Sequence, residues 1–205
     1  MRRKYGSVYE FTVVLGEIEP DIWRRIQVPE SYSFWDLHVA IQDAMGWQDY
    51  HLHSFDVAVP RTGEQVRIGI PDEDFADEMP TLPGWDVSIA DFFVEAGTRA
   101  PYLYDFGDSW EHTVTLERVL PRQERKRYPR CIAGERHCPP EDCGGVWGYE
   151  EFLQAIRDPE HEEHESMLEW VGGSFDPEAF DPRKVRFDSP RERWKIAFGR
   201  RRGLS

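Results

Sequence analysis

The sequence predicts an α+β fold, in which a largely antiparallel or mixed sheet packs against helices. Segments with alternating apolar residues, typical of strands, are interspersed with segments of helical spacing, and no Ser-, Gly- or Pro-rich linker long enough to separate two domains interrupts them. A chain of 205 residues can bury one substantial core. We therefore expect a single domain over residues 1–205, with a cysteine-containing loop, a helical C-terminal part and a basic tail from about 189 to 205.

The chain is expected to open with a β-hairpin and a helix. Residues 8–15 (VYEFTVVL) alternate apolar and polar side chains, and residues 22–28 (IWRRIQV) follow after a turn, which predicts two paired strands. Ser33 and Asp36 form a capping-box pattern at the start of a helix, and Gly46 ends it. The residues of this helix at core-facing spacing are Phe34, Leu37, His38, Ile41, Ala44 and Met45.

The middle of the chain is expected to contain further strands and one short helix. Residues 51–59 and 64–70 read as two strands, and residues 71–84, rich in acids and prolines, as a long exposed loop. Residues 88–97 (SIADFFVEAG) indicate a short helix. Residues 102–120 have the pattern of a hairpin, because the Gly-Asp pair after its first strand can supply the positive φ angles of a two-residue turn.

Three helices are expected in the C-terminal part. Residues 148–158 and 160–173 have helical spacing and are separated near Pro159, which cannot continue a helix. Ser189 and Pro190 have the residue types favoured at a helix start, so a last helix is expected to begin there.

All three cysteines lie in one short stretch, CIAGERHCPPEDCGG, and three cysteines cannot pair completely as disulfides. Clustered thiols in such a chain favour metal binding or redox chemistry, and structural zinc takes four thiolate or imidazole ligands. If the strand that begins at Trp110 pairs antiparallel with the segment around Cys131, this cysteine falls opposite Leu116 and close to His112. We therefore expect a structural zinc held by Cys131, Cys138, Cys143 and His112, with His51, His53 and His137 as alternative fourth ligands.

Two other interpretations of the cysteines remain open. The thiols can be small buried side chains, with His112 as a hydrogen-bonded core histidine. They can also be reactive, but Glu141 and Asp142 beside Cys143 disfavour a thiolate. Independently, the carboxylates and imidazole of the 105–112 hairpin can supply acid and base groups.

Charge limits the choice of partners. From Asp181 onward there are nine Lys or Arg against three acids, a net charge of +6, whereas residues 1–180 carry −20. A body this acidic repels phosphate backbones, so we expect no sequence-specific DNA binding. The basic tail can pair with the protein's own acidic surface or contact an acidic partner or nucleic acid. No apolar run is long enough for a membrane span and the chain start lacks a signal-peptide pattern, so we expect a cytoplasmic protein without membrane contact.

Four strings in the sequence are familiar in combination: FWDLHVAIQDAMGW, HLHSF, YLYDFGDSWEH and CIAGERHCPPEDCGGVWGYEEFLQAI. From about Tyr9 to Phe187, the chain resembles the plasmid pRiA4b ORF-3-like family, whose members are also described as TnpR-like passenger proteins of transposons. The resemblance implies an α+β domain of bacterial or archaeal origin, in some cases associated with mobile elements, and no established activity. A serine resolvase would need a nucleophilic serine with an arginine cluster and a basic DNA-binding domain, and this acidic chain shows neither in recognisable form.

Two function classes follow. The favoured one is a non-enzymatic interaction or accessory module, whose acidic body and basic tail engage a protein partner. The alternative is a metal-dependent or carboxylate-based hydrolase with a cleft near the Tyr102–His112 hairpin. The two differ in the metal site, because a structural zinc is closed by four protein ligands and a catalytic zinc keeps a position open to water. The sequence indicates no oligomeric state.

Overall fold

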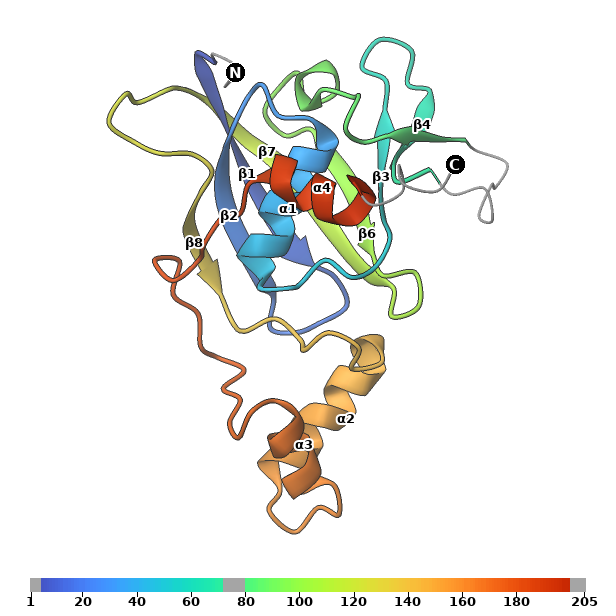
Figure 1. Ribbon diagram of the computed structural model, residues 1–205, viewed down its shortest axis with the longest axis vertical. Coiled ribbons are helices and arrows are strands. Elements are labelled where there is room, and N and C mark those ends of the chain that lie inside the picture. Colours follow the sequence, from blue (N-terminus) through green and yellow to red (C-terminus); the bar gives the residue numbers. More distant parts are fainter. Residues whose placement is uncertain (1–4, 72–79, 200–205) are drawn as a thin grey trace.

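The computed structural model describes residues 5–71 and 80–199, and its centre is one eight-stranded sheet in the order β5-β4-β3-β6-β7-β1-β2-β8 (Figure 1). All neighbouring strands are antiparallel except β4 and β5, which are parallel. The α+β prediction is therefore confirmed. The strands are β1 (Ser7–Leu15), β2 (Ile22–Pro29), β3 (His53–Ala58), β4 (Gln65–Gly69), β5 (Thr81–Pro83), β6 (Arg99–Tyr104), β7 (Trp110–Pro121) and β8 (Arg130–Glu135).

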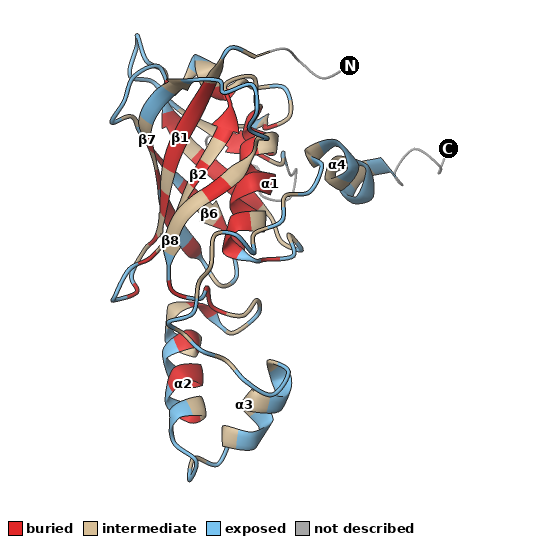
Figure 2. Ribbon diagram, turned by 90° about the vertical axis from the view of Figure 1, so that its left-hand side faces the viewer, coloured by how far each residue is buried: buried red, intermediate tan, exposed pale blue. Residues whose placement is uncertain are grey.

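The helix α1 (Phe34–Met45) covers one face of this sheet, and the main core lies between them (Figures 1 and 2). Its start is the expected capping box, because the Ser33 hydroxyl accepts from the Asp36 N–H and the Asp36 carboxylate accepts from the Ser33 N–H. The predicted helix phase is confirmed, since Leu37 and Ile41 are fully buried. Gly46 ends the helix in the left-handed conformation, with φ of 93°.

The position of β8 differs from the expectation. We expected the segment around Cys131 to pair with β7, but Cys131 lies opposite Ile26 of β2, and β7 pairs with β1 and β6. Two whole strands, β1 and β2, therefore lie between Cys131 and His112. Apolar alternation identifies a strand but not its neighbour, because every strand on this face presents the same kind of side chain.

Three local expectations are corrected as well. The hairpin between β6 and β7 closes through a longer loop, in which Asp105 and Ser109, rather than the expected Gly107 and Asp108, have positive φ. The short helix after Ser88 is a single 3-10 turn, η1 (Ile89–Asp91). The expected long loop of residues 71–84 ends in β5, and its residues 72–79 lie outside the described part of the chain.

The C-terminal part leaves the sheet and returns to it. The helices α2 (Gly145–Arg157) and α3 (His164–Trp170) form an appendage beyond one end of the sheet, as Figure 2 shows. The chain then runs back, and α4 (Pro190–Phe198) lies against α1, where the Trp35 indole N–H donates to the Pro190 carbonyl (3.0 Å). None of the helices in the described part of the chain is long and apolar enough to pass through a membrane.

Candidate site between the sheet and the helical appendage

The residues expected to bind zinc have separate surroundings. The Cys131 thiol, on β8, donates to the carbonyl of Ala133 (3.4 Å), while Cys138 Sγ lies 3.3 Å from Nη2 of Arg24. Cys143 is in the loop before α2, and His112 is on β7. Within residues 5–71 and 80–199, no three of these four bring their ligand atoms within 4.8 Å of one another. The expected ligand set is therefore not assembled, because β1 and β2 separate β7 from β8.

The thiols are neutral side chains in these surroundings. Burial raises the pKa of Cys138 to about 11, although the nearby Arg24 lowers it in part. Burial, together with the negative charge of Asp108, raises the pKa of Cys143 to about 12. These surroundings fit the alternative interpretation, in which the cysteines fill space in the core.

His112 and His53 are core histidines. The Nδ1–H group of His112 donates to the carbonyl of Trp110 (2.9 Å), and burial lowers the pKa of His112 to about 4. His53 is stacked on His38, with ring centroids 3.4 Å apart, and its pKa is well below the usual value because the ring is buried. Both rings are therefore neutral near pH 7. His137, another alternative ligand, packs its ring against Phe175.

A line of hydrogen bonds runs from the core to α4. The Gln42 amide donates to the Tyr102 hydroxyl (2.9 Å), and this hydroxyl is hydrogen-bonded to Nδ1 of His38 (2.8 Å). The Nε2–H group of His38 then donates to Asp49 (2.7 Å), and Asp49 pairs with Arg193 of α4 (3.4 Å). Arg193, a half-buried basic residue of the tail, is thus paired with the protein's own acids.

Residues 139–145, here called the docking loop, attach the appendage to the sheet. Trp47 donates through its indole N–H to the carbonyl that opens the loop (2.9 Å). One carboxylate oxygen of Glu141 accepts from the main-chain N–H of Gln48 (2.8 Å), and the other accepts from the Tyr104 hydroxyl. Burial and the Glu141 charge raise the pKa of Tyr104, so this hydroxyl keeps its hydrogen.

The two glycines that end the docking loop allow it to lie directly on the β6–β7 hairpin. A Cβ atom at Gly145 would come within 2.6 Å of the carbonyl oxygen of Asp108, and its φ of 71° is itself unfavourable for other residues. The N–H of Gly144 donates to the Asp108 carboxylate (3.2 Å). These docking contacts account for Glu141 and the two glycines of the string PPEDCGG.

Three side chains converge beside this loop: His51 from the segment before β3, Asp105 from the β6–β7 loop and Asp142 from the docking loop. The Nε2 atom of His51 lies 3.0 Å from Oδ1 of Asp142 and 3.6 Å from Oδ2 of Asp105. This nitrogen is buried and has no hydrogen-bond partner in the described residues, so neither short contact has the direction of a hydrogen bond. Asp105 and Asp142 both have positive φ, 58° and 59°, a conformation uncommon for residues other than glycine.

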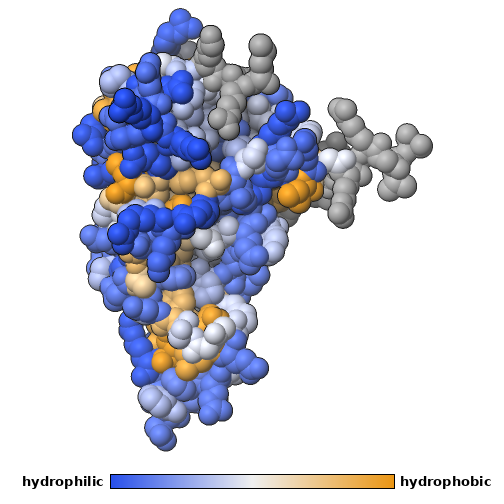
Figure 3. Space-filling model, turned by 60° about the vertical axis from the view of Figure 1, so that its left-hand side comes forward, coloured by the Kyte–Doolittle hydropathy of each residue, from blue (hydrophilic) through white to orange (hydrophobic). Residues whose placement is uncertain are grey.

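Two adjoining hollows are here together called the acidic groove. One lies between the docking loop, α2 and α3, and the other lies between the end of α1, the docking loop and the segment after α3. Their volumes are about 400 and 490 Å³, and they share Asp142 and Trp170. Among the described residues that line them, there is no Lys or Arg. A space-filling view shows an apolar patch at the level of the appendage with hydrophilic side chains around it (Figure 3). The acids of the groove are Glu141, Asp142, Glu151, Glu163 and Asp176, and its aromatic side chains are Trp47, Tyr50, Phe152, Trp170 and Phe175.

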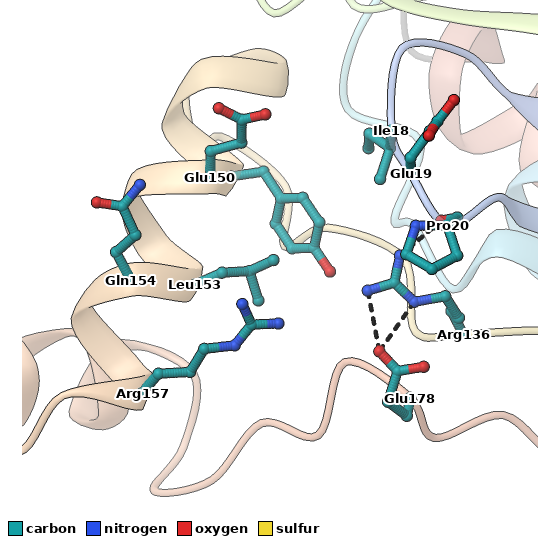
Figure 4. Close-up of a pocket in the computed structure, with 10 residues that line it drawn as sticks. Ile18, Glu19, Pro20, Arg136, Glu150, Leu153, Gln154, Arg157 and Glu178 are labelled. Atoms are coloured by element: carbon teal, nitrogen blue, oxygen red, sulfur yellow. Dashed lines mark hydrogen bonds and ion pairs between the residues drawn. The ribbon is translucent and has the colours of Figure 1, made fainter.

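A further hollow of about 340 Å³ lies where α2 faces the β1–β2 turn (Figure 4). Glu150, Gln154 and Arg157 of α2 lie along one wall in this view. On the opposite side, the Arg136 guanidinium donates to the Pro20 carbonyl (2.6 Å) and pairs with Glu178 (3.0 Å). The charge of Arg136 is therefore already compensated, and this contact fastens the segment after α3 to the sheet.

Comparisons with known proteins agree with this architecture. A family model described as plasmid pRiA4b ORF-3-like protein matches residues 7–184. The chain belongs to this family. An uncharacterized protein of Sinorhizobium fredii, y4hQ, is 40% identical over 170 residues, which cover 82% of this chain and 83% of that protein. The crystal structure of MM3350 from Methanosarcina mazei Go1, a protein of unknown function, is 47% identical with a TM-score of 0.81 and matches 90% of this chain and 100% of its own.

Three of the four strings that carry the resemblance to the pRiA4b ORF-3-like family meet at this site. HLHSF supplies His51, YLYDFGDSWEH supplies Asp105, and the cysteine-containing string supplies Asp142. Sequence analysis considered His51 and Asp105 separately and missed Asp142 as their neighbour. The sequence does show that each string places an acid or a histidine in a loop. Nothing in the residues around each loop, however, indicates that the three loops touch.

Proposed function

We propose that this member of the pRiA4b ORF-3-like family is a non-enzymatic interaction module, and that the acidic groove binds a basic segment of a protein partner. The observation that carries the proposal is the combination of several carboxylates and aromatic side chains in the groove with no Lys or Arg among the described residues that line it. A ligand that supplies cations would complete this surface, because like-charged ligands are repelled and opposite charges are attracted on approach.

The charge of the appendage supports this choice. Residues 141–178 contain twelve Asp or Glu and a single Arg, so this part of the chain carries most of the protein's formal charge of −14. Such a surface disfavours nucleic acid, whose phosphates it repels. It also steers a basic ligand toward the groove and should give binding that weakens with salt.

The aromatic side chains support a peptide rather than a simple ion. Tyr50 and Trp170 are 70% and 48% exposed, and both line the groove. Exposed aromatic residues are enriched at protein interfaces, and Lys or Arg side chains stack on their faces while the aliphatic stems cover apolar surface. A segment with alternating basic and apolar residues would use both properties of the groove.

The test is the binding of a fluorescent, Lys- and Arg-rich peptide, measured by anisotropy at low and physiological salt. Replacing two groove acids together, Glu163→Gln with Asp176→Asn, should weaken binding at least about tenfold, since close charge pairs across an interface can contribute about 1.5 kcal/mol or more. A matched variant, Glu160→Gln with Glu165→Gln, changes the net charge equally but outside the groove. It should leave binding nearly unchanged.

Two results would contradict the proposal. If both double variants weaken binding equally, the peptide responds only to net charge and the groove has no special role. If an acidic peptide of matched length binds as well as the basic one, charge complementarity is the wrong explanation.

One specific observation supports the alternative function, a hydrolase. His51, Asp105 and Asp142 lie together at the β6–β7 hairpin, where the sequence alternative placed a cleft. Carboxylates and an imidazole can act as general acids, bases or metal ligands. Turnover of simple phosphate and carboxylic esters that is lost in Asp105→Asn and retained in Asp108→Asn would favour an enzyme over a binding module.

A further inference from the structure

We propose that His51, Asp105 and Asp142 bind one divalent transition-metal cation, with zinc as the preferred ion. The proposal concerns a different ligand set from the cysteines, and of its three residues only Asp142 also lines the acidic groove. It rests on the mutual distances of the three ligand atoms, on the unsatisfied nitrogen of His51 and on the chemistry of the set.

The distances match ligands around a single ion. Zinc binds imidazole nitrogen and carboxylate oxygen at about 2.0 to 2.2 Å, so neighbouring ligand atoms in a tetrahedral site lie roughly 3.4 Å apart. Nε2 of His51 is 3.0 Å from Asp142 Oδ1 and 3.6 Å from Asp105 Oδ2, and all three ligand atoms lie within 4.8 Å of one another. No main-chain movement is needed to bring the loops together.

The nitrogen of His51 provides the second observation. It is buried, and although two carboxylates lie within ion-pair distance, it has no hydrogen-bond partner in the described residues. A buried polar atom without a partner is costly. Ligands of one cation need not point at each other, so an ion between the three would satisfy this nitrogen and both carboxylates.

The surroundings hold Asp105 in the position of a ligand. Its Oδ1 atom accepts from the N–H of Gly107 (2.9 Å), which leaves Oδ2 directed to His51. Asp105 is largely buried, and its N–H donates to the carbonyl of Leu52 (2.9 Å). Hydrogen bonds of this kind orient metal ligands and are part of functional metal sites.

One imidazole with two carboxylates fits zinc or manganese better than calcium, which takes only oxygen ligands, or copper(I), which prefers sulfur. Three protein ligands leave at least one coordination position open, so water or an acidic group of a partner would complete the site. The ion would also link three loops that belong to β3, the β6–β7 hairpin and the appendage.

The experiment is a titration of the full, chelator-treated chain with zinc, followed by calorimetry. One ion per chain is expected. Asp142→Asn is the most informative variant, because Asp142 Oδ1 is a ligand atom but its side chain is 65% exposed, so the change does not disturb the core. It should weaken zinc binding at least about 100-fold, since even groups that only orient ligands cost 10- to 100-fold. Glu111→Gln, at an exposed position of the same hairpin and outside the ligand group, is the matched control and should bind zinc normally.

Zinc bound at the cysteines would give different results in the same experiment. Cobalt(II) bound at His51, Asp105 and Asp142 should show no thiolate-to-metal charge-transfer absorption, and Cys143→Ser should keep full zinc affinity. Zinc binding that survives Asp142→Asn, a thiolate signature with cobalt, or absence of binding to the unmodified chain would each overturn the proposal.

Discussion

The sheet body and the helical appendage differ in how much of their structure is buried. Every core-facing position of α1 is inaccessible to solvent, whereas α3 has no buried residue and α2 buries only Gly145, Tyr149, Phe152, Leu153 and Ala155. The body supplies the stability of the fold, because stability scales with apolar area removed from water. The appendage instead presents acids and aromatic side chains. It is held to the body by the docking loop, by Arg136 and by the buried side of α2, whose Tyr149 and Phe152 belong to the same hydrophobic cluster as the body.

This difference separates stability from function in the molecule. Changes in the body should alter folding, and changes in the appendage should alter binding with little cost in folding. Each of the following variants is chosen to test that separation.

The largest effect is expected at α1. Ile41 is fully buried beneath the sheet, so Ile41→Ala should lower the free energy of unfolding by about 2 to 5 kcal/mol through lost burial and a residual cavity. Urea denaturation followed by tryptophan fluorescence measures this. Leu168→Ala in α3, where no residue is buried, is the matched change and should cost far less. Equal losses in the two variants would mean that the appendage contributes to stability as much as the body does.

Acid should weaken the body through its buried histidines. The pKa of His112 is about 4 in the folded protein, against 6.5 in an unfolded chain. Between these two pH values the unfolded state therefore binds a proton that the folded state does not bind. The stability contribution is complete above pH 6.5 and is lost as the pH falls to 4, a loss of about 3 kcal/mol. Unfolding free energies measured across this range should show it, and His112→Asn, which keeps a donor for the Trp110 carbonyl, should flatten the curve. An unchanged slope in this variant would assign the acid sensitivity to other groups.

A substitution at Glu141 should weaken the attachment of the appendage to the body. Glu141→Gln replaces a carboxylate that accepts two hydrogen bonds by an amide that can accept only one of them, at a cost of about 1 to 3 kcal/mol. Because the lost contact is local to the docking loop, hydrogen exchange should accelerate in α2 but not in α1. Equal acceleration in both helices would show that body and appendage open as one unit.

Local elements could be predicted from the sequence, and contacts between distant segments could not. The start and end of α1 were predictable because Ser33, Asp36 and Gly46 act on the backbone within a few residues of themselves. The strand that pairs with β8 could not be predicted, because the alternation of apolar residues in a strand carries no information about which strand lies beside it.

The cluster of His51, Asp105 and Asp142 could not be predicted for the same reason. The composition of the cysteine stretch predicted metal chemistry at its thiols, whereas the structure brings together His51 and two aspartates from three separate loops. Such a constellation depends on sheet order and on the conformation of the docking loop, where Asp142 has positive φ. Neither is encoded in the spacing of the residues themselves.

A modest stability effect and a large binding effect are expected together at Trp170. This residue is 48% exposed and its ring packs edge-on against Phe152, with centroids 5.8 Å apart. Trp170→Ala should therefore cost less than Ile41→Ala, since it removes one such pair, worth about 1 kcal/mol, and the partial burial of one side chain. If the acidic groove binds a basic segment, the same change should weaken that binding about 30-fold, because interface tryptophans commonly contribute 2 kcal/mol or more. Trp147→Ala is the control, since Trp147 is 80% exposed on α2 but does not line the groove. Peptide anisotropy measures the binding affinity of both variants, and urea denaturation measures their free energy of unfolding. Equal binding losses at Trp147 and Trp170 would place the partner elsewhere on the appendage.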